Sequence, residues 1–203
     1  LSIMWSFWSF LTYTLHFQLK YLYGNIFENT NYCGASDAIA ILSGGFIYTF
    51  MGGLVPTYYL AFGISTFGGL AILYRENNNT EIETAVQINP EYAYYRRMHF
   101  LIFIARFGIA MGITATELAA FTDERLLPLE RKTDALALIT LIVYSVSSLA
   151  PLINEIDEPT PIIVFLIILF LVLLNIFYLE IPPPSPLIEH KKRIEKLKRE
   201  LKK

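Results

Sequence analysis

One stretch of this chain, residues 161–179, restricts the whole fold. It reads PIIVFLIILFLVLLNIFYL and carries no charged residue over 19 positions. As a helix it reaches about 30 Å, which is the thickness of the hydrocarbon core of a bilayer. The stretch therefore predicts a membrane span, and with it an integral membrane protein.

The composition indicates several such spans. Of the 203 residues, 54% are hydrophobic and 17% are charged, whereas a soluble domain carries about 25% charged residues. We expect an all-α, polytopic integral membrane protein with about six transmembrane helices, at roughly 3–23, 36–52, 56–74, 97–121, 134–153 and 160–179. An organellar inner membrane or a prokaryotic cell membrane is the favoured location, and a secretory-pathway membrane is the alternative.

The number of spans depends on residues 38–74. This apolar stretch is 37 residues long, and one span takes about 17–25 residues. Gly52, Gly53 and Pro56 lie near its centre and favour a tight turn there. We therefore expect a hairpin of two spans, with a single crossing and five spans in total as the alternative.

The end of the chain differs from the rest. Residues 1–181 form the predicted transmembrane domain, and residues 182–203 form a proline-rich spacer followed by a basic amphipathic helix. Eight of the 16 Lys and Arg residues lie after position 190, so the positive-inside rule places this tail on the cytoplasmic side. We expect this helix to dock on anionic lipid or on a partner helix, with a solvated, salt-bridged stalk as the alternative.

Arg106 lies within the fourth predicted span, where an unpaired arginine costs at least about 2.5–3.5 kcal/mol. Glu117 follows eleven residues later on nearly the same helix face, but about 16 Å further along the axis. Asp37 stands at the opening of the second predicted span, near the membrane surface. We therefore expect no acid of this chain level with Arg106. It would snorkel, line a wet cavity or meet an acid of another subunit.

Small residues form rows along two of the spans. Gly108 and Gly112 lie four residues apart in the fourth span, and Gly45 and Gly53 belong to a second row. Such rows let helix backbones approach closely in lipid. Packing within this chain is the expected role, and docking against another subunit is the alternative.

His16 and His99 both fall toward the outer leaflet when six spans are counted. Two histidines on facing helices are able to ligate a b-type haem or to bind a quinone head group. The alternative is a pair of interfacial histidines bonded to backbone or lipid. No other cofactor is expected, apart from bound lipids. The single Cys33 excludes an internal disulfide and a cysteine-based metal site.

The spans contain no catalytic signature and no paired carboxylates. The sequence therefore favours a non-catalytic subunit of a larger membrane complex, such as a respiratory or energy-transducing assembly of mitochondria. Its partners would be lipids and other membrane subunits, not nucleic acid. The alternatives are a small transporter or channel with a polar path near Arg106, and the haem or quinone protein.

Overall fold

A computed structural model describes residues 1–22, 25–77, 93–123, 126–127, 129–156 and 160–179, and every regular element in them is helical. The all-α prediction is therefore confirmed, with no strand in these ranges. The helices are α1 (Ser2–Gln18), α2 (Ile26–Phe50), α3 (Leu54–Asn77), α5 (Ala93–Thr122), α6 (Lys132–Ser147), α7 (Ala150–Asn154) and α8 (Thr160–Tyr178), with a short 3₁₀ turn at Leu129–Arg131. The predicted tail helix, within 182–203, lies outside the described residues.

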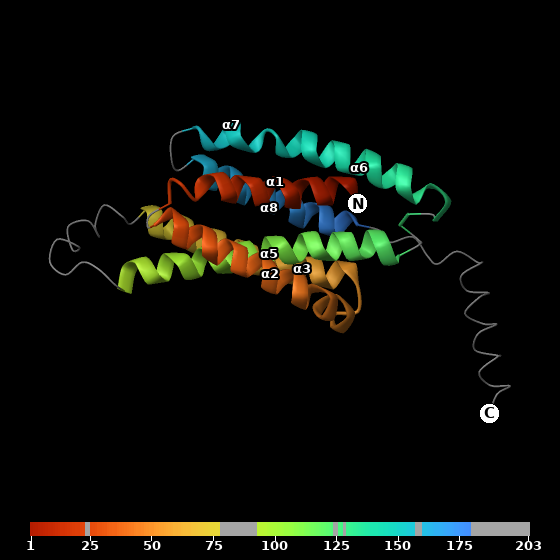
Figure 1. Cartoon of the computed structure of the whole chain (residues 1–203), viewed down its shortest axis with the longest axis horizontal. Coiled ribbons are helices and arrows are strands. Elements are labelled where there is room, and N and C mark those ends of the chain that lie inside the picture. The colour runs from red at the N-terminus through yellow and green to blue at the C-terminus, as the bar shows by residue number, and fades with distance from the viewer. Residues whose placement is uncertain (23–24, 78–92, 124–125, 128, 157–159, 180–203) are drawn as a thin grey trace, which may run out of the picture.

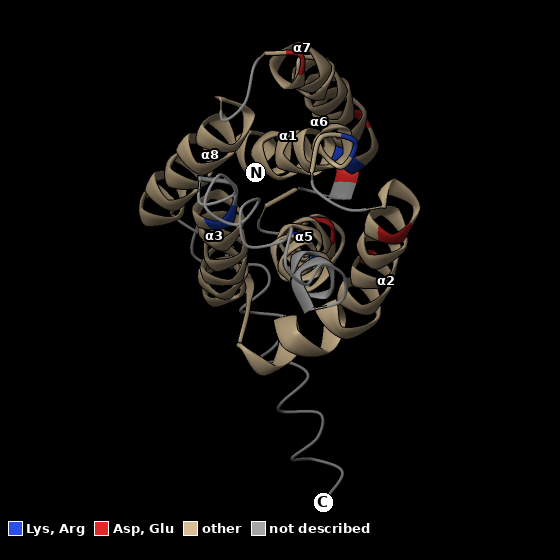
Figure 2. Cartoon of the chain, turned by 90° about the vertical axis from the view of Figure 1, so that its left-hand side faces the viewer, with Lys and Arg blue, Asp and Glu red and all other residues tan. Residues whose placement is uncertain are grey.

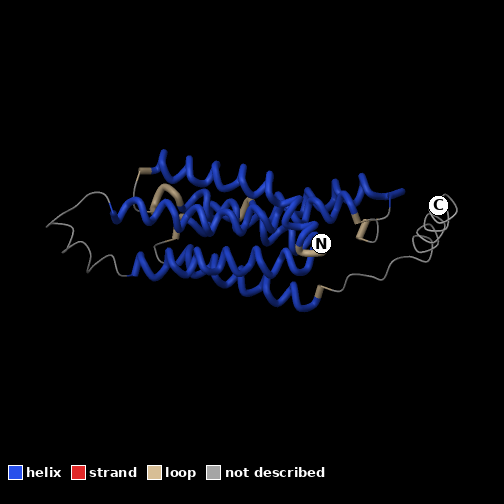
Figure 3. The backbone as a smooth tube through the Cα atoms, turned by 90° about the horizontal axis from the view of Figure 1, so that it is seen from below, coloured by secondary structure: helices blue, strands red, loops and turns tan. Residues whose placement is uncertain are grey.

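The helices run side by side along one direction, as expected of a multi-pass membrane bundle (Figures 1 and 3). Five segments of the described chain are long and apolar enough to cross a membrane: α2, α3, α5, α8 and the stretch Lys132–Asn154, which joins α6 to α7. With 17 residues, α1 reaches about 26 Å and lies in the same bundle. The start of α1 and the end of α8 lie at one end of the bundle (Figure 1).

The hairpin prediction for residues 38–74 is confirmed, and the single crossing is wrong. Gly52 and Gly53 adopt φ values of +79° and +135° between α2 and α3. Only glycine occupies this backbone region without steric cost, so the two residues reverse the chain where a side chain would strain it.

The predicted start of the second span is wrong by about ten residues. We expected a loop up to residue 36, but α2 begins at Ile26. Asn25 caps it, because its side-chain oxygen accepts a hydrogen bond of 2.9 Å from the Phe27 backbone N–H. The Thr30 hydroxyl donates to the Ile26 carbonyl within the first turns. Polar residues thus extend the helix instead of forming a loop, and Asp37 lies about 16 Å from its start.

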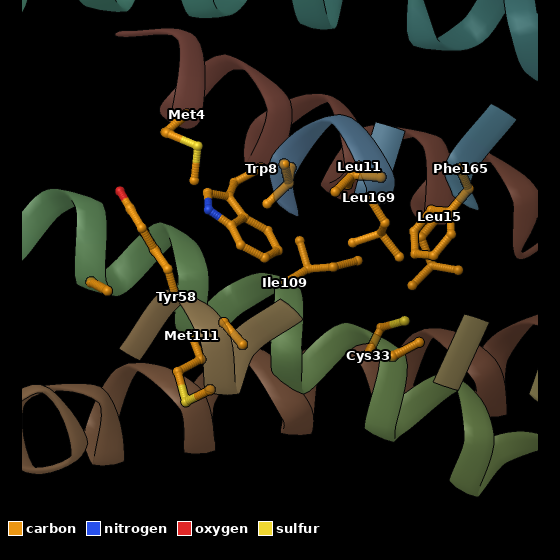
Figure 4. Close-up of a cluster of buried hydrophobic side chains, with 14 of the residues drawn as sticks. Met4, Trp8, Leu11, Leu15, Cys33, Tyr58, Ile109, Met111, Phe165 and Leu169 are labelled. Atoms are coloured by element: carbon orange, nitrogen blue, oxygen red, sulfur yellow. The ribbon is translucent and has the colours of Figure 1, made fainter. Parts of the chain in front are cut away.

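The central helix of the bundle is α5, which packs against α1, α2 and α3 (Figure 2). On the other side, α1 and α8 connect this group to α6 and α7. Trp8 of α1 and Tyr58 of α3 are fully buried, with 6.2 Å between their ring centroids, and Trp8 lies beside Ile109 of α5 (Figure 4). The perimeter is apolar as well: Leu42 and Phe46 of α2 are 83% and 73% exposed, as suits helices solvated by lipid.

Candidate functional site

Arg106 of α5 forms a forked ion pair with Asp37 of α2. Its Nε donates to Asp37 Oδ1 and its Nη2 donates to Asp37 Oδ2, both at 2.7 Å. Two parallel charge-assisted hydrogen bonds are the geometry in which arginine binds a carboxylate most specifically. The pair therefore joins α5 to α2 well inside both helices.

A third helix completes the arrangement. Nη1 of Arg106 donates to the backbone carbonyl of Thr12 in α1 at 2.9 Å. The carboxylate of Asp37 and the carbonyl of Thr12 thus converge on the guanidinium from two helices. Both supply oxygen atoms, which suit a cation.

This geometry corrects the prediction about Arg106. We expected no acid of this chain level with Arg106, because Asp37 was placed near the membrane surface. Once α2 begins at Ile26, Asp37 is eleven residues into the helix and Arg106 is thirteen residues into α5, so the two lie at nearly equal depth. The chain itself supplies the neutralising charge.

Burial differs between the two partners. The side chain of Arg106 is 5% exposed, whereas that of Asp37 is 28% exposed. Asp37 is therefore the member of the pair that lies nearer the perimeter of the bundle. His16 of α1 is exposed and, like Cys33 of α2, lies within electrostatic range of both members of the pair.

His99 occupies the same α2–α5 interface, seven residues before Arg106. Its Nδ1 lies 2.5 Å from Asn29 Oδ1 and its Nε2 lies 2.9 Å from Glu28 Oε2. The ring also stacks on Tyr32, with 5.2 Å between centroids. Both ring nitrogens face oxygen atoms of this chain, so in this arrangement His99 has none free for the haem iron that we considered for His16 and His99.

Glu117 lies further along α5 and is exposed. His99, Arg106 and Glu117 are separated by seven and eleven residues, which at 100° per residue places all three within about 20° of one helix face. We call these three residues the α5 polar face. It extends for about 27 Å, and its first two members are held by side chains of α2.

The predicted packing glycines divide into two groups. A Cβ atom on Gly108 would lie 2.6 Å from the Ser65 backbone nitrogen, and one on Gly112 would overlap the Trp8 ring. These two glycines are at close helix contacts, as expected. Gly45 and Gly53 are not, since an added Cβ at either meets no atom within 4 Å. Gly44, next to Gly45, is the residue that packs on α5, against Thr114.

Asp37 and Glu28 are the site residues that the sequence reasoning missed. The available signal was the pair Asn25 and Glu28, because an N-cap residue followed three positions later by Glu marks a helix start. A helix that starts there places Asp37 within the span, at a depth where it can pair with Arg106.

No family model, curated protein or solved structure matches this chain. In the described residues, no group of three or more His, Cys, Asp or Glu side chains is placed to hold a metal ion. The functional argument therefore depends on the geometry of the α5 polar face.

Proposed function

We propose that this protein carries a small polar solute across a membrane along the α5 polar face. The observation that supports the proposal is the row of ionisable groups itself. Ionisable residues within membrane helices are costly and occur mainly on substrate, ion or proton pathways. The three residues share one face of α5 over about 27 Å.

The surroundings of the row support the same function. Glu28 and Asp37 of α2 place acids opposite His99 and Arg106. The side chain of Asp37, 28% exposed, places one acid of this set at the edge of the bundle.

The test is flux in liposomes that contain the purified chain. Radiolabelled lactate, choline and glucose serve as anionic, cationic and neutral probes. Uptake of at least one probe above the rate of protein-free liposomes is expected, and Arg106→Gln should abolish it. Ser145→Ala is the matched control, because that hydroxyl bonds only the Leu141 carbonyl of its own helix and is exposed. Uptake of none of the three probes would sink the proposal.

A second candidate is the non-catalytic subunit of a larger membrane complex, including a respiratory or energy-transducing one. Because Asp37 already pairs with Arg106, this arginine does not require an acid from another subunit. One observation still favours it: Gly45 presents open space to the outside of α2, where a helix of another subunit would fit closely. If so, Gly45→Leu leaves the isolated chain stable but prevents co-purification of a partner from its native membrane. An unchanged set of co-purified proteins would count against this candidate.

A further inference from the structure

We propose that the Arg106–Asp37 pair is the substrate site of the transport function, and that it takes a carboxylate-bearing anion together with one proton. This inference rests on the proposed function. The proton binds to Asp37, and the carboxylate of the solute then takes the place of the Asp37 carboxylate on the Arg106 guanidinium.

Charge balance selects this combination. In the structure, the buried guanidinium is neutralised by one carboxylate through two hydrogen bonds of 2.7 Å. A solute anion that joined the ionised pair would leave two carboxylates facing one guanidinium. A solute cation on Asp37 would displace Arg106 and leave it buried without an anion. An uncompensated charge in such a place is strongly unfavourable.

Protonation of Asp37 removes this conflict. A neutral Asp37 no longer needs the guanidinium, and Arg106 then requires another anion, which the solute supplies. The total charge is the same before and after, because one proton and one monoanion enter together. No covalent bond other than the O–H bond of Asp37 forms or breaks.

The surroundings of Asp37 decide which other groups the test has to separate from it. Asp37 is the more exposed member of the pair. The titratable and charged groups around it are Arg106 of α5, His16 of α1 and Cys33 of its own helix. From α3, which also packs on α2, the charged residue whose side chain the structure describes is Arg75, in its last turn. His16 is thus the second group whose titration has to be separated from that of Asp37.

The experiment measures binding of benzoate and of lactate to the full chain in detergent, at pH values from 5.5 to 8.5, by isothermal calorimetry. In the range where Asp37 is ionised in the free protein, the affinity should rise about tenfold for each unit by which the pH falls, since one proton accompanies each anion. Asp37→Asn mimics the protonated state, so it should bind with an affinity that no longer depends on pH. Arg106→Gln should not bind at all.

Two further variants keep the result interpretable. His16→Gln should retain the pH dependence of binding. If binding by this variant does not depend on pH, the proton binds to His16 and the proposal is overturned. The double variant Asp37→Asn/Arg106→Gln removes both charges and should fold without binding either anion. Binding by the unaltered chain that is independent of pH, or no binding by Asp37→Asn, also overturns the inference. Flux of choline or glucose instead of lactate would leave the transport function intact and refute only the anion site.

Discussion

The helix α5 meets its two main neighbours through different chemistry. Against α3 the contact is close and made of small residues: a Cβ on Gly68 would lie 2.5 Å from the Ala105 backbone nitrogen. Against α2 the contact depends on side-chain pairs, Arg106 with Asp37 and His99 with Asn29. Gly44 against Thr114 is the close contact on that side.

The difference shows which interface is able to change. Where two backbones pack at van der Waals distance, separating the helices loses all of these contacts at once. An ion pair is different, since a proton on the carboxylate cancels the attraction without moving any atom of the backbone. We infer that α3 and α5 form a fixed unit, and that α2 is the helix whose attachment to it responds to protons and solutes.

The largest effect on stability is expected from Arg106→Leu. It leaves Asp37 charged and unpaired among apolar helices, which should cost about 3–5 kcal/mol. The measurement is thermal unfolding of the purified chain in detergent. The double variant Arg106→Leu/Asp37→Leu removes both charges and should recover most of the loss. A double variant as unstable as the single one would show that the pair does not couple α2 to α5.

A smaller loss is expected from Gly68→Ala at the other interface. The new methyl group would lie 2.6 Å from the Ala105 Cα atom, and backbone cannot rotate away as a side chain does. Overpacking of this kind costs about 1–3 kcal/mol. Gly63→Ala on the same helix is the control, since its Cβ meets no atom within 4 Å. Equal unfolding temperatures for the two variants would refute the fixed interface.

Tyr58→Phe tests whether polar contacts contribute at the α3–α5 interface. The Tyr58 hydroxyl lies 2.8 Å from the Thr116 hydroxyl, and both side chains are buried. Loss of one hydrogen bond costs about 0.5–1.5 kcal/mol. The Thr116 hydroxyl also bonds the Gly112 carbonyl and so is not stranded. A loss as large as that of Arg106→Leu, measured in the same unfolding assay, would remove the contrast between the two interfaces.

Gly34→Ala should have the smallest effect. Gly34 lies on the outer side of α2, and an added Cβ meets no atom within 4 Å. We expect a change within about 0.5 kcal/mol. Gly44→Ala is the comparison, because its methyl group would lie 2.5 Å from the Thr114 side chain. The two stability losses together distinguish the lipid-facing side of α2 from the side that packs on α5. A marked loss at Gly34 would mean that this side also packs on protein.

Much of the helical layout could be predicted from the sequence, because apolar length and glycine turns are local signals. The span at 160–179 and the reversal at Gly52–Gly53 follow directly from them. The start of α2 could not be found from hydropathy, since residues 25–37 are polar enough to read as a loop. Their helix is held by the Asn25 cap and by packing on α5, and packing involves residues far away in the chain.

By itself the sequence determined that this chain is an all-α membrane protein and that Arg106 cannot lie bare in lipid, because an unpaired charge there is costly. Only the tertiary structure decided who the partner is. Helix depth depends on where each helix begins and on which helices pack together, so Asp37, sixty-nine positions away in the chain, became the neighbour of Arg106. The same packing brought His99 to Asn29 and aligned the α5 polar face with α2.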